Sequence, residues 1–151
     1  MRRQERAITD RVAIDAIIRR SRVCHLGLSD AGQPYVVPLS FGYDGSCLYF
    51  HAAREGRKVN ILQKNSRVCF EFDILEEIIS AEKACNWSMR YQSVIGFGSA
   101  EIVTEPDAKA AALNCIMGQY TSSDWTFGEQ ELAATLVIRV RIDEISGKAR
   151  L

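Results

Sequence analysis

Three basic residues surround a glycine near the middle of the chain, where the sequence pattern changes. Residues 51–65 read HAAREGRKVNILQKN, with Arg54, Arg57 and Lys58 around Gly56. The run before them is apolar and typical of a strand, whereas the apolar positions after the glycine have helical spacing. A strand that turns through a glycine into a helix directs free N–H groups and the positive end of the helix dipole at one spot. Two further cations in the first helical turn oppose that dipole, so a bound anion would relieve the conflict.

Phosphate is the anion that this combination of residues fits best. Arginine offers a planar fork of donors, and lysine offers a compact point charge. The alternative is a solvated basic surface that Glu55 partly neutralises. Spacing alone favours neither interpretation, so both stay open at this point.

A proline interrupts the second expected strand. Residues 33–43 otherwise read as a strand, but Pro38 cannot donate a hydrogen bond to a neighbouring strand. It therefore marks a sheet edge or an irregularity where backbone groups are free. Such a place is either an ordinary edge or a surface for a flat heteroaromatic ring with a hydrogen-bonding rim.

A glycine-rich stretch further on resembles a dinucleotide fingerprint only at its start. Residues 96–101 read GFGSAE, with Glu101 where the third glycine belongs, and the pattern continues as a strand. We therefore reject a dinucleotide fold. The glycines predict instead a bent barrel strand or the close approach of a ligand.

The composition is that of a globular protein without net charge. Of the 151 residues, 47% are hydrophobic, and 19 basic side chains balance 19 acidic ones. No overall field draws the chain to nucleic acid or to an anionic membrane, so any basic site is local. There is no apolar run of about 18 residues, and the first ten residues lack the apolar stretch of a secretory signal. We expect a single domain, residues 1–151, in the cytoplasm.

Metal binding and covalent catalysis have little support in the sequence. The five cysteines form no Cys-x-x-Cys pair, and we expect them to be reduced and mostly buried, with Cys85 exposed. Neither the cysteines nor His25 and His51 have the close spacing of a zinc site, so no metal is expected. Glu71 and Asp73 are interpreted as part of a solvated face, and no Gly-x-Ser-x-Gly motif is present.

Residue patterns predict a β-rich α+β fold with mostly antiparallel strands, in a small closed or half-closed barrel. Helices are expected after Thr9 or Asp10, after Gly56, and from Pro106 to about Tyr120, the second ending in a left-handed cap at Asn65. Residues 75–91 have no steady period and predict a long, functional loop. Strands are expected at residues 22–28, 33–43, 46–52, 67–74, 92–103 and 135–145.

Three segments in this order resemble the pyridoxamine 5′-phosphate oxidase-like FMN-binding split barrels. They are residues 38–42, residues 48–58 with the Arg57-Lys58 pair, and residues 67–71. The sequence is most similar to the branch that contains the nitroimidazole-resistance proteins, which residues 87–96, Tyr120 and Trp125 also resemble. The likeness covers the chain from about residue 22 to residue 142.

The resemblance implies a homodimer of six-stranded split barrels with FMN at the subunit interface. Arg57 and Lys58 match the positions that hold the FMN phosphate, and Ser93 adds a hydroxyl group. His51 is the one titratable side chain expected near the ring, where it either transfers protons or only positions the cofactor. The residues implied to lie along the flavin are Val37, Pro38, Leu39, Ser40, Phe50, His51 and Ala52, with Trp125 covering the ring from the partner subunit.

The family points to a flavin oxidoreductase that reduces nitro groups or other small electrophiles. The alternatives are a flavin-binding protein without turnover and a haem-binding relative that uses His51 or His25 as an axial ligand. Residues 147–151 do not resemble the arginine- and histidine-bearing end with which true pyridoxamine phosphate oxidases bind substrate. Vitamin B6 oxidation is therefore not expected.

Overall fold

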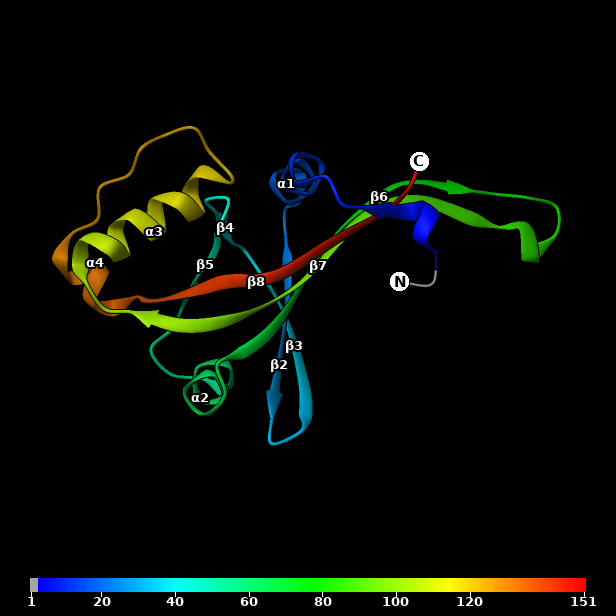
Figure 1. Cartoon of the computed structure of the whole chain (residues 1–151). Coiled ribbons are helices and arrows are strands. Elements are labelled where there is room, and N and C mark those ends of the chain that lie inside the picture. Colours follow the sequence, from blue (N-terminus) through cyan, green and yellow to red (C-terminus); the bar gives the residue numbers. More distant parts are fainter. Residues whose placement is uncertain (1–2) are drawn as a thin grey trace.

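The computed structural model describes residues 3–151, which form one antiparallel sheet of eight strands with four α-helices around it (Figure 1). The strand order is β3-β2-β6-β7-β8-β5-β4, and β1 pairs with β8. The strands are β1 (Ala7–Ile8), β2 (Cys24–Asp30), β3 (Gln33–Leu39), β4 (Gly42–Tyr43), β5 (Cys47–Ala52), β6 (Arg67–Ile79), β7 (Ser88–Val103) and β8 (Leu136–Arg150). The helices are α1 (Arg11–Arg20), α2 (Arg57–Lys64), α3 (Pro106–Gly118) and α4 (Glu129–Ala134), with 3₁₀ turns at Gln4–Arg6 and Ala84–Asn86.

The architecture is a split barrel, which confirms the expected fold class. Within the described part of the chain, β3 and β4 stand at the two ends of the strand order and do not pair. Two more strands are present than the expected six. One reason is that the strand expected at residues 33–43 breaks at Ser40 and Phe41 into β3 and β4. The other is that β1 is a two-residue pairing, too short for periodicity to detect.

The core lies on the inner face of the curved sheet and is rich in phenylalanine. Phe70 and Phe72 on β6 are fully buried, with ring centroids 6.1 Å apart, and Phe41 lies 4.8 Å from Phe72. The alternation of Val68, Phe70 and Phe72 toward one face is confirmed. Gly96 on β7 lies opposite Phe70 on β6. The missing side chain at Gly96 therefore leaves room for the close approach of a phenylalanine ring of the core.

Two local expectations are wrong. Residues 75–91 are mostly not a loop, because β6 and β7 continue as a long hairpin in which Ile79 pairs with Ser88 (Figure 1). This ribbon extends beyond the core, so it has no buried face that would produce a readable alternation. Asn65 is not a left-handed cap, because its φ is −143°. Its side chain instead accepts a hydrogen bond from the backbone N–H of Arg67 and donates one to the carbonyl of Ser29.

Helix α4 was not expected, since six residues are too few to show helical periodicity. It lies beside α3 at one side of the molecule, opposite the β6–β7 hairpin (Figure 1). No helix within residues 3–151 combines the length and the apolar character needed to cross a membrane. All five cysteines are free, and Cys85 is exposed as expected. The expectation that the others are mostly buried is wrong, because only Cys24 is buried and Cys47, Cys69 and Cys115 are partly exposed.

Candidate functional site

The first turn of α2 is a cationic helix start without a side-chain cap. Gly56 precedes it with a φ of +142°, a conformation that favours glycine. The first helical bond runs from the N–H of Asn60 to the carbonyl of Gly56, so the three N–H groups between them have no partner within the helix. Arg57 and Lys58 both belong to this turn, which contains no acidic residue.

The protein does not neutralise this charge within residues 3–151, where no ion pair involves Arg57, Lys58 or Glu55. Glu55 therefore makes no direct ion pair with these cations, although Arg57 itself is exposed. The guanidinium of Arg57 lies 4.6 Å from the ring centroid of Tyr35 on β3, which joins α2 to that strand. Lys58 is half-buried, and burial lowers its pKa below 10.5.

Strand β3 forms a free edge of the sheet next to this turn, as the proline predicted. Val37 and Leu39 face the core, whereas Pro38 and Ser40 are exposed. Proline is tolerated in a sheet where its missing N–H would face away from the neighbouring strand. Pro34 and Pro38 thus mark the backbone positions of β3 that face away from β2. Val36 lies between them in the same alternation, so its N–H and C=O also face the open edge.

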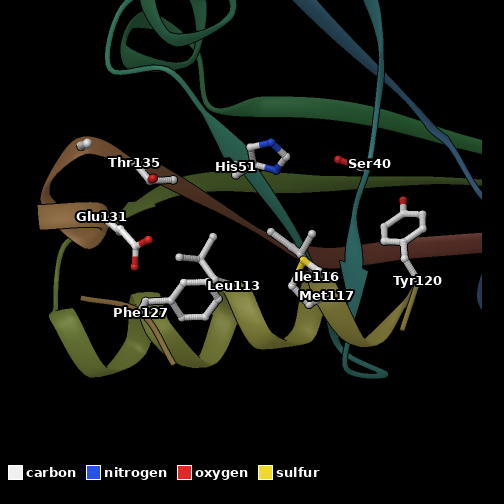
Figure 2. Close-up of a pocket in the computed structure, with 10 residues that line it drawn as sticks. Ser40, His51, Leu113, Ile116, Met117, Tyr120, Phe127, Glu131 and Thr135 are labelled. Carbon is white, nitrogen blue, oxygen red and sulfur yellow. The ribbon is translucent and has the colours of Figure 1, made fainter. Parts of the chain in front are cut away.

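A cavity of about 540 Å³ lies where β3 ends, between β5 and helices α3 and α4 (Figure 2). Ser40 and the exposed His51 line one side, and Leu113, Ile116 and Met117 of α3 line the other. Phe50 is fully buried in the core, so only its backbone can contact a ligand, and Ala52 is partly buried. The remaining lining residues are Tyr120, Phe127, Glu131, Ala134 and Thr135.

Tyr120 fixes the chain at the break between β3 and β4. Its hydroxyl accepts a hydrogen bond from the N–H of Phe41 at 3.0 Å and donates one to the carbonyl of Arg22 at 2.9 Å. Burial raises the pKa of this hydroxyl. The bridge holds Ser40 at the mouth of the cavity, so Tyr120 positions this part of the site.

Two of the expected site residues lie elsewhere. In the sheet register His51 pairs with Val137, and Val137 pairs with Val103. Ser93 is ten positions from Val103 along β7, about 30 Å in a strand. Ser93 therefore lies far from His51 within one chain. Trp125 lies in the α3–α4 loop and is 46% exposed.

A separate polar group lies on the outer face of β2 and β6. Nδ1 of His25 lies 3.0 Å from a carboxylate oxygen of Glu71 and 3.9 Å from one of Asp73. Asp73 is exposed, as interpreted from the sequence, whereas Glu71 is only partly exposed and burial raises its pKa. The donor atoms of these three residues lie within 4.8 Å of one another and could hold a metal ion, which the sequence did not predict.

Comparison with known proteins defines the family. The sequence model of the pyridoxamine 5′-phosphate oxidase family matches residues 10–149, so the chain belongs to this family. A candidate 5-nitroimidazole antibiotic resistance protein from Bacteroides thetaiotaomicron is 33% identical and superimposes with a TM-score of 0.86 over 95% of this chain and 86% of that one. The branch resemblance seen in the sequence is thus confirmed. No curated protein matches the chain.

Two further solved structures share the fold. The flavocytochrome Anf3 from Azotobacter vinelandii is 26% identical, with a TM-score of 0.88 over 100% of this chain and 72% of that one. A FAD and heme binding protein from Mycobacterium smegmatis is 24% identical, with a TM-score of 0.87 over 95% of this chain and 73% of that one. At that level of identity the second likeness concerns the fold alone.

Sequence reasoning missed the helical wall of the cavity. Leu113 and Met117 belong to an alanine-rich helix with no polar residue that marks a site, and Glu131 lies on the unexpected α4. They line the same cavity as His51 because α3 packs against β4 and β5, and α4 packs against α3. The one signal in the sequence was the unexplained aromatic content of residues 120–127.

Proposed function

We propose that the protein binds FMN and works as an oxidoreductase on nitro groups or other small electrophiles. The observation that carries this proposal is the cationic first turn of α2, which the described protein residues leave without a counter-charge beside the free edge of β3. Three free N–H groups, a guanidinium and an ammonium group suit a phosphate dianion. FMN, when bound, supplies electron transfer in steps of one or two electrons.

The edge of β3 suits the ring of the same cofactor. The outward carbonyls of Pro34, Val36 and Pro38 accept hydrogen bonds, and the N–H of Val36 donates one. An isoalloxazine ring carries donors and acceptors along one rim, so the two edges are complementary. His51 of β5 lines the cavity at the end of β3 together with Ser40. The edge prolines also protect β3 from pairing with other chains, which accounts for them without a ligand.

FMN fits better than FAD, because residues 3–151 contain one cationic helix start without a side-chain cap, and the sequence has no glycine fingerprint for a second phosphate. A relative supports flavin binding as such more directly than the choice of FMN. Anf3, at 26% identity, is called a flavocytochrome, whereas the Mycobacterium smegmatis protein that is named for FAD and heme supports the fold alone.

The charge on Lys58 gives FMN binding a predictable pH dependence. Burial favours neutral Lys58, so its folded pKa lies below 10.5, and a bound phosphate favours the charged form. FMN affinity should therefore fall as the pH rises through the lowered pKa of Lys58. Titrations of flavin fluorescence between neutral pH and pH 10.5 measure this fall. In a Lys58→Arg variant the fall should be absent, because a guanidinium stays charged throughout. An identical pH profile in both proteins would remove Lys58 from the phosphate site.

A second copy of the chain would complete the site. Val36, Ile95 and Phe97 are exposed on the outer face of the sheet, which continues to Ser93. A partner packed there would cover this apolar surface and bring its own Ser93, and Trp125 from its α3–α4 loop, toward the flavin. We predict a homodimer, with a mass of twice 16.9 kDa at sedimentation equilibrium. A monomer that binds FMN tightly would contradict this shared site.

Catalysis is the second half of the proposal, and His51 is the candidate catalytic residue. Its imidazole lines the cavity beside Ser40, where it could hold a proton for the acceptor. Reduction of a nitro group to a nitroso group takes two electrons and two protons and releases water, with a reduced nicotinamide as the electron donor. Anaerobic reduction by NADH or NADPH, followed by reoxidation with a nitroimidazole, tests this activity. FMN binding without reduction or reoxidation would favour a flavin-binding protein without turnover.

A further inference from the structure

The cavity beside His51 has largely apolar walls. Leu113, Ile116 and Met117 form its helical wall, and Phe127 extends it toward α4 (Figure 2). The hydroxyl of Tyr120 is already bonded to Phe41 and Arg22. At about 540 Å³ the cavity is in the range of small-molecule sites and has room for one or two aromatic rings.

Glu131 is the one acidic residue among the lining residues that the structure describes, and these include no lysine or arginine. One of its carboxylate oxygens accepts a hydrogen bond from the N–H of Gly128 at 2.8 Å. The other oxygen, Oε1, has no hydrogen-bond partner within residues 3–151, and Figure 2 shows the carboxylate directed from α4 toward Leu113. The cavity therefore has an anionic rim.

Two basic side chains contact α4 but line another hollow. Arg54 donates to the carbonyl of Ala133, and Lys109 donates to the carbonyl of Leu132. Both interactions hold the C-terminal end of α4, where cations stabilise the helix dipole. Arg54 and Lys109 line a hollow with Ile102 and Val103 and do not line the cavity that contains His51.

We infer that this cavity binds small flat aromatic molecules that are positively charged or neutral, and that it excludes anions. An anion would lose its hydration against apolar walls and meet the carboxylate of Glu131. The inference rests on the proposed function in one respect: if the protein is an oxidoreductase, such a molecule would be its electron acceptor. It also excludes pyridoxamine 5′-phosphate from this cavity, because its phosphate group would find no lysine or arginine there.

Three probes of the same size and different charge test the inference. Benzamidine is a cation, benzamide is neutral and benzoate is an anion. Ligand-detected NMR titrations at about pH 8 give the three affinities. An exposed charge pair contributes a factor of about five. We expect benzamidine to bind about fivefold more tightly than benzamide, and benzoate about fivefold more weakly.

Two variants of α4 locate the effect. Glu131→Gln keeps an oxygen for the N–H of Gly128 but removes the charge, so benzamidine should lose its advantage over benzamide. Glu129→Gln is the matched control, because Glu129 belongs to the same first turn but lines a hollow with Pro106 and Lys109. It should leave the order unchanged. Leu113→Trp fills the cavity and should weaken all three probes at least tenfold.

The titrations are run on protein with and without FMN, so that the two proposals fail separately. A protein that binds no flavin but shows the charge order retains this inference and loses the proposed function. Equal affinities for the three probes, no binding of any of them, or an order that Glu131→Gln leaves intact would overturn the inference. Exclusion of all probes by bound FMN would overturn it too, because the flavin itself would then fill the cavity.

Discussion

A variant with alanine at both positions 57 and 58 is expected to bind FMN at least about a hundredfold more weakly than the wild-type protein. Each charge-assisted hydrogen bond to a phosphate dianion contributes about 1.5–3 kcal/mol. The pair should thus cost about 3–6 kcal/mol, less some non-additivity between neighbours. Titration of flavin fluorescence measures the affinities.

Riboflavin and a neighbouring arginine supply the controls. Riboflavin has the same ring without the phosphate, so its weaker binding should change little in the double variant, whereas unfolding would abolish both. Arg54→Ala removes a cation from the same stretch whose guanidinium is bonded to the carbonyl of Ala133. It should leave FMN affinity within about threefold of wild type. If the double variant also kept FMN affinity within about threefold of wild type, Arg57 and Lys58 would form only a solvated surface.

Replacing Gly96 with alanine is expected to destabilise the fold by about 3 kcal/mol. A Cβ at this position would lie 2.5 Å from Cε2 of Phe70 and 2.7 Å from the carbonyl oxygen of Glu144. Phe70 has no room to move, because it is fully buried against Phe72. Urea unfolding followed by circular dichroism measures the change in the free energy of unfolding.

A second substitution tests the cause. Phe70→Leu removes the ring atoms that clash, so the combined variant Gly96→Ala/Phe70→Leu should lose about 1–2 kcal/mol less than the sum of the single variants. The rescue should be partial, since the carbonyl of Glu144 stays in place. Gly118→Ala is the control, because no atom lies within 4 Å of a Cβ built there. If Gly96→Ala left stability within about 0.5 kcal/mol of wild type, the close packing of β7 on Phe70 would be wrong.

The fold was largely readable from the sequence where one face of an element is buried. Apolar and polar residues alternate in residues 67–74 because β6 packs one face on the core. Asp10 was identifiable as a helix cap, and its side chain accepts hydrogen bonds from two N–H groups of α1. The same signal fails where burial ends. The sequence shows no hydrophobic periodicity in three places. These are the outer half of the β6–β7 hairpin, the two residues of β1 and the six residues of α4.

The candidate site divides in the same way. Gly56, Arg57 and Lys58 are adjacent in the chain, so their convergence at a helix start followed from local geometry alone. The stacking of Arg57 on Tyr35 depends on where β3 runs in the sheet, and the meeting of His51 with Leu113 and Glu131 depends on helix packing. Neither arrangement can be inferred from the spacing of residues in the sequence. The family resemblance named Ser93, but only the strand register shows how far it lies from the rest.

Identification of the bound cofactor tests the central claim most directly. The protein is purified, its ligand is released by heat, and the released flavin is compared with FMN, FAD and riboflavin by chromatography. Protein without ligand is incubated with FMN first. FMN at one molecule per chain is the predicted result, because each chain contributes one α2 turn with its Arg57 and Lys58. Release of FAD, or of no flavin after incubation with FMN, would contradict the account.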